Sequence, residues 1–134
     1  MSELRADTIT ASDGTSPVTL TGQTAAKAWA NINGSTFALR DSFNVGSATD
    51  NGTGDYTINL TNSMGNANYC VGVSATDDSS TAGQTDGFAY GSWVRGSNSP
   101  GYAAGSMRVQ VGYPANNELF DQSHVNISLH GDLA

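Results

Sequence analysis

Residues 50–60 read Asp-Asn-Gly-Thr-Gly-Asp-Tyr-Thr-Ile-Asn-Leu, so a dense turn signal is followed at once by an alternating segment. Gly and Asn tolerate backbone angles that other residues avoid, which predicts a tight turn over 50–55. Tyr56, Ile58 and Leu60 then alternate with polar residues, as in a strand that buries one face. The combination favours a β protein.

The same alternation recurs along the chain between segments rich in Gly, Ser, Thr and Asn, which together supply 58 of the 134 residues. Good helix formers are scarce, with only two Glu and one Lys. Further strands are expected at 7–11, 18–21, 69–73, 88–94, 107–111 and 125–129. Short strands joined by turns predict an all-β fold, either an antiparallel β-sandwich or a jelly-roll-like domain.

Residues 24–32 are ambiguous, because Ala25 to Trp29 would be tolerated in a helix while the alternation through Ile32 fits a strand. A hairpin is the preferred interpretation, since Asn33-Gly34 is typical of a turn with positive φ at both positions. The returning strand would run over 37–45, with Phe37, Leu39, Asp41, Phe43 and Val45 on one face.

The chain length fits one domain, which divides into an N-terminal arm over 1–21 and a β-sandwich body over 22–134. The arm cannot offset its ordering entropy in isolation, at about 1–2 kcal/mol per residue. We therefore expect it to attach the protein to neighbours and to build a homotrimer together with one face of a sheet. Its large apolar residues are Leu4, Ile9, Val18 and Leu20.

Charge and composition argue against several function classes. The net charge is −7 and the five basic residues are scattered, so nucleic-acid binding is not expected. No apolar run is long enough to predict membrane insertion, and no signal peptide is expected at the N-terminus. Cys70 is the single cysteine; its setting in an alternating segment predicts a buried structural thiol.

Neither a catalytic residue, nor a metal site, nor a cofactor is predicted. His124 and His130 flank the last expected strand, about 20 Å apart by strand rise, so they cannot share a metal within one chain. Three copies of one histidine on a trimer axis stay an alternative. The turn at 50–55 resembles a calcium loop only loosely, because the bidentate Glu is missing. No carboxylate pair or Gly-x-Ser-x-Gly motif points to hydrolysis.

Aromatic residues in the second half of the chain suggest glycan contact as a further possibility. Aromatic faces beside Asn and Asp can stack on sugar rings while polar groups bind the hydroxyls. The candidate residues are Tyr90, Trp93, Tyr102 and Tyr113.

Ordered motifs along most of the chain resemble short fibre-like structural proteins of marine bacteriophage virions. The motifs are residues 4–9, 26–29, 40–45, 49–57, 66–69 and 131–133. The resemblance implies a trimeric tail-fibre, spike or capsid-decoration module in the virion, with other virion proteins as partners and no catalytic residues. The alternative is a receptor-binding adhesin of the tail that recognises a host cell-surface glycan through loops 77–86 and 95–105.

Overall fold

The computed structural model describes residues 25–76, 91–94, 101–113 and 118–134, and for 91–94 and 113 it describes the backbone alone. The described residues form strands and turns and contain no helix, which confirms the expected all-β class. None of them forms a helix long and apolar enough to cross a membrane. The expected arm over 1–21 lies outside the described residues, as do the strands expected at 7–11 and 18–21.

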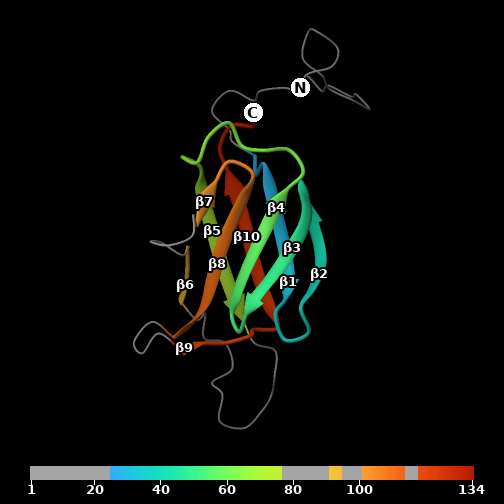
Figure 1. Ribbon diagram of the computed structural model, residues 1–134, viewed down its shortest axis with the longest axis vertical. Helices are drawn as coiled ribbons and strands as arrows, with labels where there is room; N and C mark the ends of the chain where they lie inside the picture. Colours follow the sequence, from blue (N-terminus) through green and yellow to red (C-terminus); the bar gives the residue numbers. More distant parts are fainter. Residues whose placement is uncertain (1–24, 77–90, 95–100, 114–117) are drawn as a thin grey trace, which may run out of the picture.

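Two antiparallel sheets pack face to face, in the arrangement of a β-sandwich (Figure 1). One sheet has the order β2-β1-β10-β5 and the other the order β3-β4-β8-β6, with two short strands also pairing with β8. The strands of the first sheet are β1 (Ala28–Asn33), β2 (Ala38–Phe43), β5 (Cys70–Thr76) and β10 (His124–His130). Those of the second are β3 (Val45–Gly52), β4 (Asp55–Leu60), β6 (Gly91–Val94), β7 (Tyr102–Ala103), β8 (Ser106–Tyr113) and β9 (Glu118–Leu119).

The core lies between the sheets and is made by alternate residues of the central strands, because successive side chains of a strand point to opposite faces. β1 and β10 supply one wall, and β4 and β8 supply the other. The fully buried members on these four strands are Ala28, Ile32, Tyr56, Ile58, Met107, Val109, Val111, Val125 and Leu129. The alternation seen in the sequence at 56–60, 107–111 and 125–129 is therefore the core-forming pattern.

Within the ambiguous segment the strand interpretation is confirmed for Ala28 to Ile32, which lie in β1, and β1 and β2 form the expected antiparallel hairpin. The expected turn type is wrong, because neither Asn33 nor Gly34 has a positive φ angle. The connection runs over 34–37 instead, and Phe37 takes the left-handed conformation with φ 44°. Gly34 serves close packing: a Cβ there would lie 2.6 Å from the Gln122 carbonyl oxygen and still closer to the Tyr56 hydroxyl.

The single strand expected over 37–45 is also wrong, because the chain changes sheets at Asn44. Asn44 has φ 55°, which ends β2 and starts β3 in the other sheet. A register shift in the β1–β2 pair further breaks the common face, and Phe43 ends up 55% exposed. The Asn44 side chain fixes the crossing, since its amide donates to the carbonyls of Lys27 and Asn62, each at 3.0 Å.

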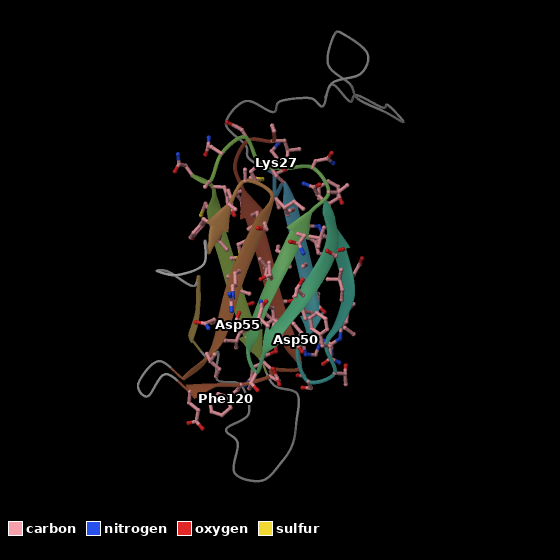
Figure 2. All side chains as sticks on the ribbon, in the orientation of Figure 1. Lys27, Asp50, Asp55 and Phe120 are labelled. Atoms are coloured by element: carbon pink, nitrogen blue, oxygen red, sulfur yellow. The ribbon has the colours of Figure 1, made fainter. Side chains whose placement is uncertain are left out.

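The turn predicted at 50–55 connects β3 to β4, with positive φ at Gly52 and Gly54. The carboxylates of Asp50 and Asp55 accept hydrogen bonds that stabilise the turn and the sheet. Asp50 Oδ1 accepts from the Gly52 amide at 2.9 Å, and Asp55 points onto the outer face of the β4–β8 pair. Figure 2 places both acids at the end of the sandwich opposite Lys27.

Cys70 is exposed, so the prediction of a buried thiol is wrong. The reason is strand parity. Tyr69 and Ala75 point into the core, and Val71 and Val73 pack against it. Cys70 has the opposite parity and therefore faces out, directly across the pair from His130.

Candidate functional site

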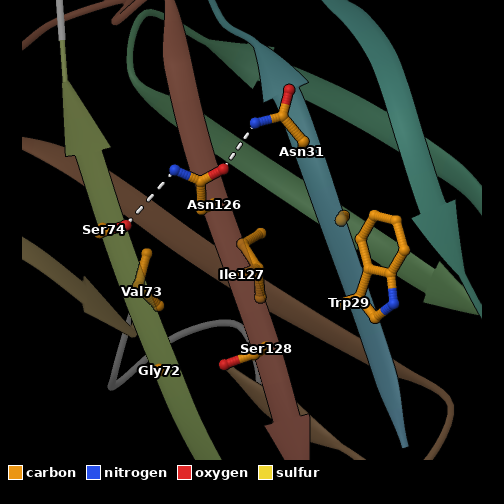
Figure 3. Close-up of a pocket in the computed structure, with 9 residues that line it drawn as sticks. Trp29, Asn31, Gly72, Val73, Ser74, Asn126, Ile127 and Ser128 are labelled. Atoms are coloured by element: carbon orange, nitrogen blue, oxygen red, sulfur yellow. Dashed lines mark hydrogen bonds between the residues drawn. The ribbon is translucent and has the colours of Figure 1, made fainter. Parts of the chain in front are cut away.

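A shallow groove of about 490 Å³ lies on the outer face of the β2-β1-β10-β5 sheet (Figure 3). It runs across three neighbouring strands, β1, β10 and β5, which come from distant parts of the sequence. The side chains that line it on the outer face are Trp29, Asn31, Ser74, Asn126 and Ser128, and the lining also includes Gly72, Ala30, Val73 and Ile127.

Strand register brings these residues together. Asn31 lies opposite Asn126, which lies opposite Ser74 on the next strand. Two residues further along each strand, Trp29 lies opposite Ser128, and Ser128 lies opposite Gly72. All six positions have outward parity, because their neighbours Ala30, Val73 and Ile127 face or pack against the core.

A chain of hydrogen bonds joins the polar side chains across the three strands (Figure 3). Asn31 Nδ2 donates to Asn126 Oδ1 at 2.5 Å, and Asn126 Nδ2 donates to Ser74 Oγ at 3.4 Å. Each amide nitrogen carries a second proton, Asn31 Oδ1 is an acceptor, and each hydroxyl can both donate and accept. The row is therefore held in place while it keeps donors and acceptors for a ligand.

Trp29 and Gly72 give the groove its shape. The Trp29 side chain is 37% exposed and forms an aromatic wall on the β1 side. On the β5 side, Gly72 leaves a hollow, because a Cβ there would lie 2.8 Å from Ser128 Oγ. An exposed aromatic ring beside fixed polar groups offers both apolar contact and hydrogen bonds to a small polar ligand.

The groove is electrically neutral, since none of the side chains that line it is ionisable. The lining therefore offers no side chain of ordinary acid–base chemistry for proton transfer, and no carboxylate, imidazole or thiol to hold a metal. Among the described residues, no cluster of His, Cys, Asp and Glu is arranged to hold a metal ion. What the arrangement can do is bind a neutral polar ligand that also has an apolar face.

A second polar cluster lies on the outer face of the other sheet, around Asp55. Arg108 donates two hydrogen bonds to this carboxylate, at 2.7 and 2.8 Å, and Gln110 donates a third at 2.8 Å. Asp55 is 4% exposed, and its charge raises the pKa of Arg108 through that hydrogen bond. Because its groups satisfy one another, the cluster links β4 to β8 and is a structural feature.

The aromatic residues predicted to contact glycan are distributed differently. Tyr90 lies outside the described residues, and the side chains of Trp93 and Tyr113 do as well, although their backbones lie in β6 and β8. Tyr102 is 40% exposed, and its ring packs against Tyr69 with centroids 5.3 Å apart. β6, β7 and β8 all belong to the second sheet, so these positions are separate from the groove.

The proposed attachment residues Leu4, Ile9, Val18 and Leu20 also lie outside the described residues. Comparison with protein-family models, with curated proteins and with solved structures gave no match.

The groove itself escaped sequence reasoning, although one signal for it was present. In 26–32 the small and aliphatic residues alternate with Lys27, Trp29 and Asn31, so Trp29 belongs to the polar face. Tryptophan has a large apolar ring and one polar N–H group, so its place on the polar face of a strand makes it available for contact with a ligand. What the sequence does not reveal is that Asn126 and Ser74 come to lie beside it.

Proposed function

We propose that this chain is a non-catalytic, glycan-binding module of a bacteriophage virion protein, and that the groove beside Trp29 is its binding site. The observation that carries the proposal is the combination of an exposed indole with the Asn31–Asn126–Ser74 row. A pyranose ring has one apolar face of C–H groups and a rim of hydroxyls. The indole can stack on the apolar C–H face, and the amides and hydroxyls of the row can form hydrogen bonds with the sugar hydroxyls.

The virion context rests on the resemblance of the sequence motifs to fibre-like proteins of marine bacteriophages. A rigid β-sandwich with its recognition residues on strands suits such a role, because strands hold side chains more precisely than loops do. In this proposal the module contacts a host cell-surface glycan, and the residues before the body attach it to other virion proteins.

Glycan-array binding followed by calorimetry on the strongest hits tests the proposal. Trp29→Ala should weaken binding at least tenfold, about 1.4 kcal/mol, because the apolar wall is lost. Gly72→Val should weaken it as well, since the added side chain fills the hollow beside Ser128.

The matched control is Tyr102→Ala, which removes an aromatic ring of similar exposure from the other sheet. It should leave binding unchanged. Loss of binding in Tyr102→Ala with full binding in Trp29→Ala would place glycan recognition in the second half of the chain and contradict the proposal.

A purely structural decoration or fibre module is the second candidate. It is favoured by β2, an edge strand whose outer backbone edge has no partner strand among the described residues and which carries the exposed Leu39 and Phe43. Edges of this kind are ready to pair with another chain. In that case no variant in the groove changes any binding property, and β2 variants change assembly.

A further inference from the structure

We propose that the ligand is an extended, neutral oligosaccharide that lies across the strands, with Phe43 forming an outer subsite beyond Trp29; this inference rests on the proposed function. The starting observation is the register of β1 and β2, in which Trp29 lies directly opposite Phe43. Directly opposite residues of an antiparallel pair point to the same face, with Cβ atoms about 5 Å apart. The two aromatic side chains are therefore neighbours on the outer face.

Phe43 continues the binding surface. Its side chain is 55% exposed, the highest value among the large hydrophobic residues of the described chain. Phe43 does not line the groove. Because β1 lies between β2 and β10, Phe43 is on the far side of Trp29 from Asn126 and Ser128. A large apolar side chain left in water costs free energy that a ligand can recover by covering it.

The polar and aromatic groups of this face follow one line across four strands. From β5 to β2 the line passes Gly72, Ser128, Trp29 and Phe43 in register. With neighbouring strands about 4.8 Å apart, it extends over about 14 Å, which is longer than one sugar ring. A ligand that uses both aromatic rings and the polar row must therefore have several sugar units.

The charge of the groove and its surroundings favours a neutral over an acidic oligosaccharide. The groove lining is neutral, and Asn31 lies opposite Asp41, an exposed carboxylate on the same outer face. Lys27 has the same outward parity as Trp29 and Asn31, and it stands just before β1 (Figure 2). The whole chain carries a net charge of −7. A uronate polymer would be repelled by the Asp41 carboxylate and by this net charge, whereas a neutral hexose chain would not.

The test measures affinity by calorimetry for galactose oligosaccharides, glucose oligosaccharides and oligogalacturonates, each from the monosaccharide to the tetrasaccharide. Galactose and galacturonate chains of the same linkage and anomeric configuration differ only in the oxidation of C6, so such matched pairs isolate the effect of charge. We expect the full-length protein to bind one of the neutral series with an affinity that rises at least tenfold from monosaccharide to trisaccharide. The matching acidic chain should bind at least tenfold more weakly.

Three variants separate this inference from the proposed function. Trp29→Ala should abolish binding at every length, Phe43→Ala should remove only the gain with length, and Phe43→Tyr should restore that gain. If Trp29→Ala abolishes binding while Phe43→Ala keeps the full gain, the outer subsite is wrong and the groove stands. Preference for the oligogalacturonates overturns the neutral class.

Sedimentation of Phe43→Ala gives the remaining outcome. An unchanged sedimentation coefficient is expected, because Phe43 is proposed to face the ligand. A drop to a smaller species would show that Phe43 lies in a contact between chains, which overturns the inference. Absence of binding to every series by the unaltered protein would overturn the inference, whereas the glycan array decides separately whether the groove binds any glycan.

Discussion

Asn44 allows the chain to pass from one sheet to the other. Its left-handed φ angle costs a residue with a Cβ about 1–2 kcal/mol, and Asn is among the residues that tolerate it best. Its side chain also donates to two carbonyls and accepts from the Asn62 amide at 2.7 Å. One residue thus supplies both the backbone turn and the bonds that hold it.

Replacement of Asn44 separates these two contributions. Asn44→Gly keeps the backbone freedom and loses the side-chain bonds, which should lower the free energy of unfolding by about 2 kcal/mol. Asn44→Ala loses both and should cost about 1 kcal/mol more. Urea denaturation of the two variants measures the difference. Equal stability of the two variants would mean that the left-handed conformation is not required at the crossing.

Tyr56 makes the stability of the protein depend on alkaline pH. Burial raises the pKa of its phenol well above the ordinary value of 10.0, and the hydrogen bond to Asp121 and the carboxylates of Asp121 and Asp50 raise it further. Burial also raises the pKa of Tyr69. In both cases the folded state favours the protonated phenol.

Stability should therefore fall as the pH rises above about 10. Below that value the phenol is protonated in both states, so the folded state keeps its full advantage. Above it the unfolded chain loses the proton while the folded state holds it, so unfolding becomes easier by about 1.4 kcal/mol per pH unit for each such tyrosine. Urea denaturation across this range should show a shallower fall in Tyr56→Phe. An identical pH profile in the two proteins would count against the assignment.

The strands that line the core could be predicted from the sequence, because alternation of apolar and polar residues directly indicates which face of a strand is buried. β4, β8 and β10 follow this rule, and so does the outward placement of Trp29 in β1. β3 was missed because its residues are mostly exposed or half-buried and show no clear period. β7 and β9 are two-residue strands, too short for any periodic signal.

The sequence does not show which strands pair with one another, and the groove depends on this pairing. Asn31 and Asn126 are 95 residues apart, and nothing local indicates that β10 lies between β1 and β5. The error at Cys70 has a related cause: a small apolar residue in a strand favours the core, but Cys70 has the opposite parity to Tyr69 and Val71 and faces out. The break at Asn44 was hidden because alternation continued on both sides of it.

For the whole molecule, assembly remains a prediction. β2 and β3, which follow one another in the chain, are each an edge strand of one sheet, and each has a single strand partner among the described residues. Exposed edges favour pairing with other copies, and the arm over 1–21 is expected to complete a homotrimer. The first described strand begins beside the end of β10, where Ala28 lies opposite Leu129, so β1 starts at the end of the sandwich that holds the C-terminus (Figure 1).

Deletion of residues 1–21 tests this division of the chain. The full-length protein should sediment as a trimer at micromolar concentration. The truncated protein should keep its β-type circular-dichroism spectrum, sediment as a smaller species and fail to join virions. An unfolded product would show that the arm belongs to the core, and normal incorporation would place attachment elsewhere in the chain.

Binding at the Trp29 groove is tested most directly by nuclear magnetic resonance of the ¹⁵N-labelled protein during titration with the neutral oligosaccharide that binds best. The indole N–H of Trp29 and the side-chain amides of Asn31 and Asn126 report on the site without any mutation. We predict that the signals of these three side chains shift together and saturate, while the backbone amide signals of β8 do not shift. Shifts confined to β6, β7 and β8, with the Trp29 indole unmoved, would contradict the assignment of the groove as the glycan site.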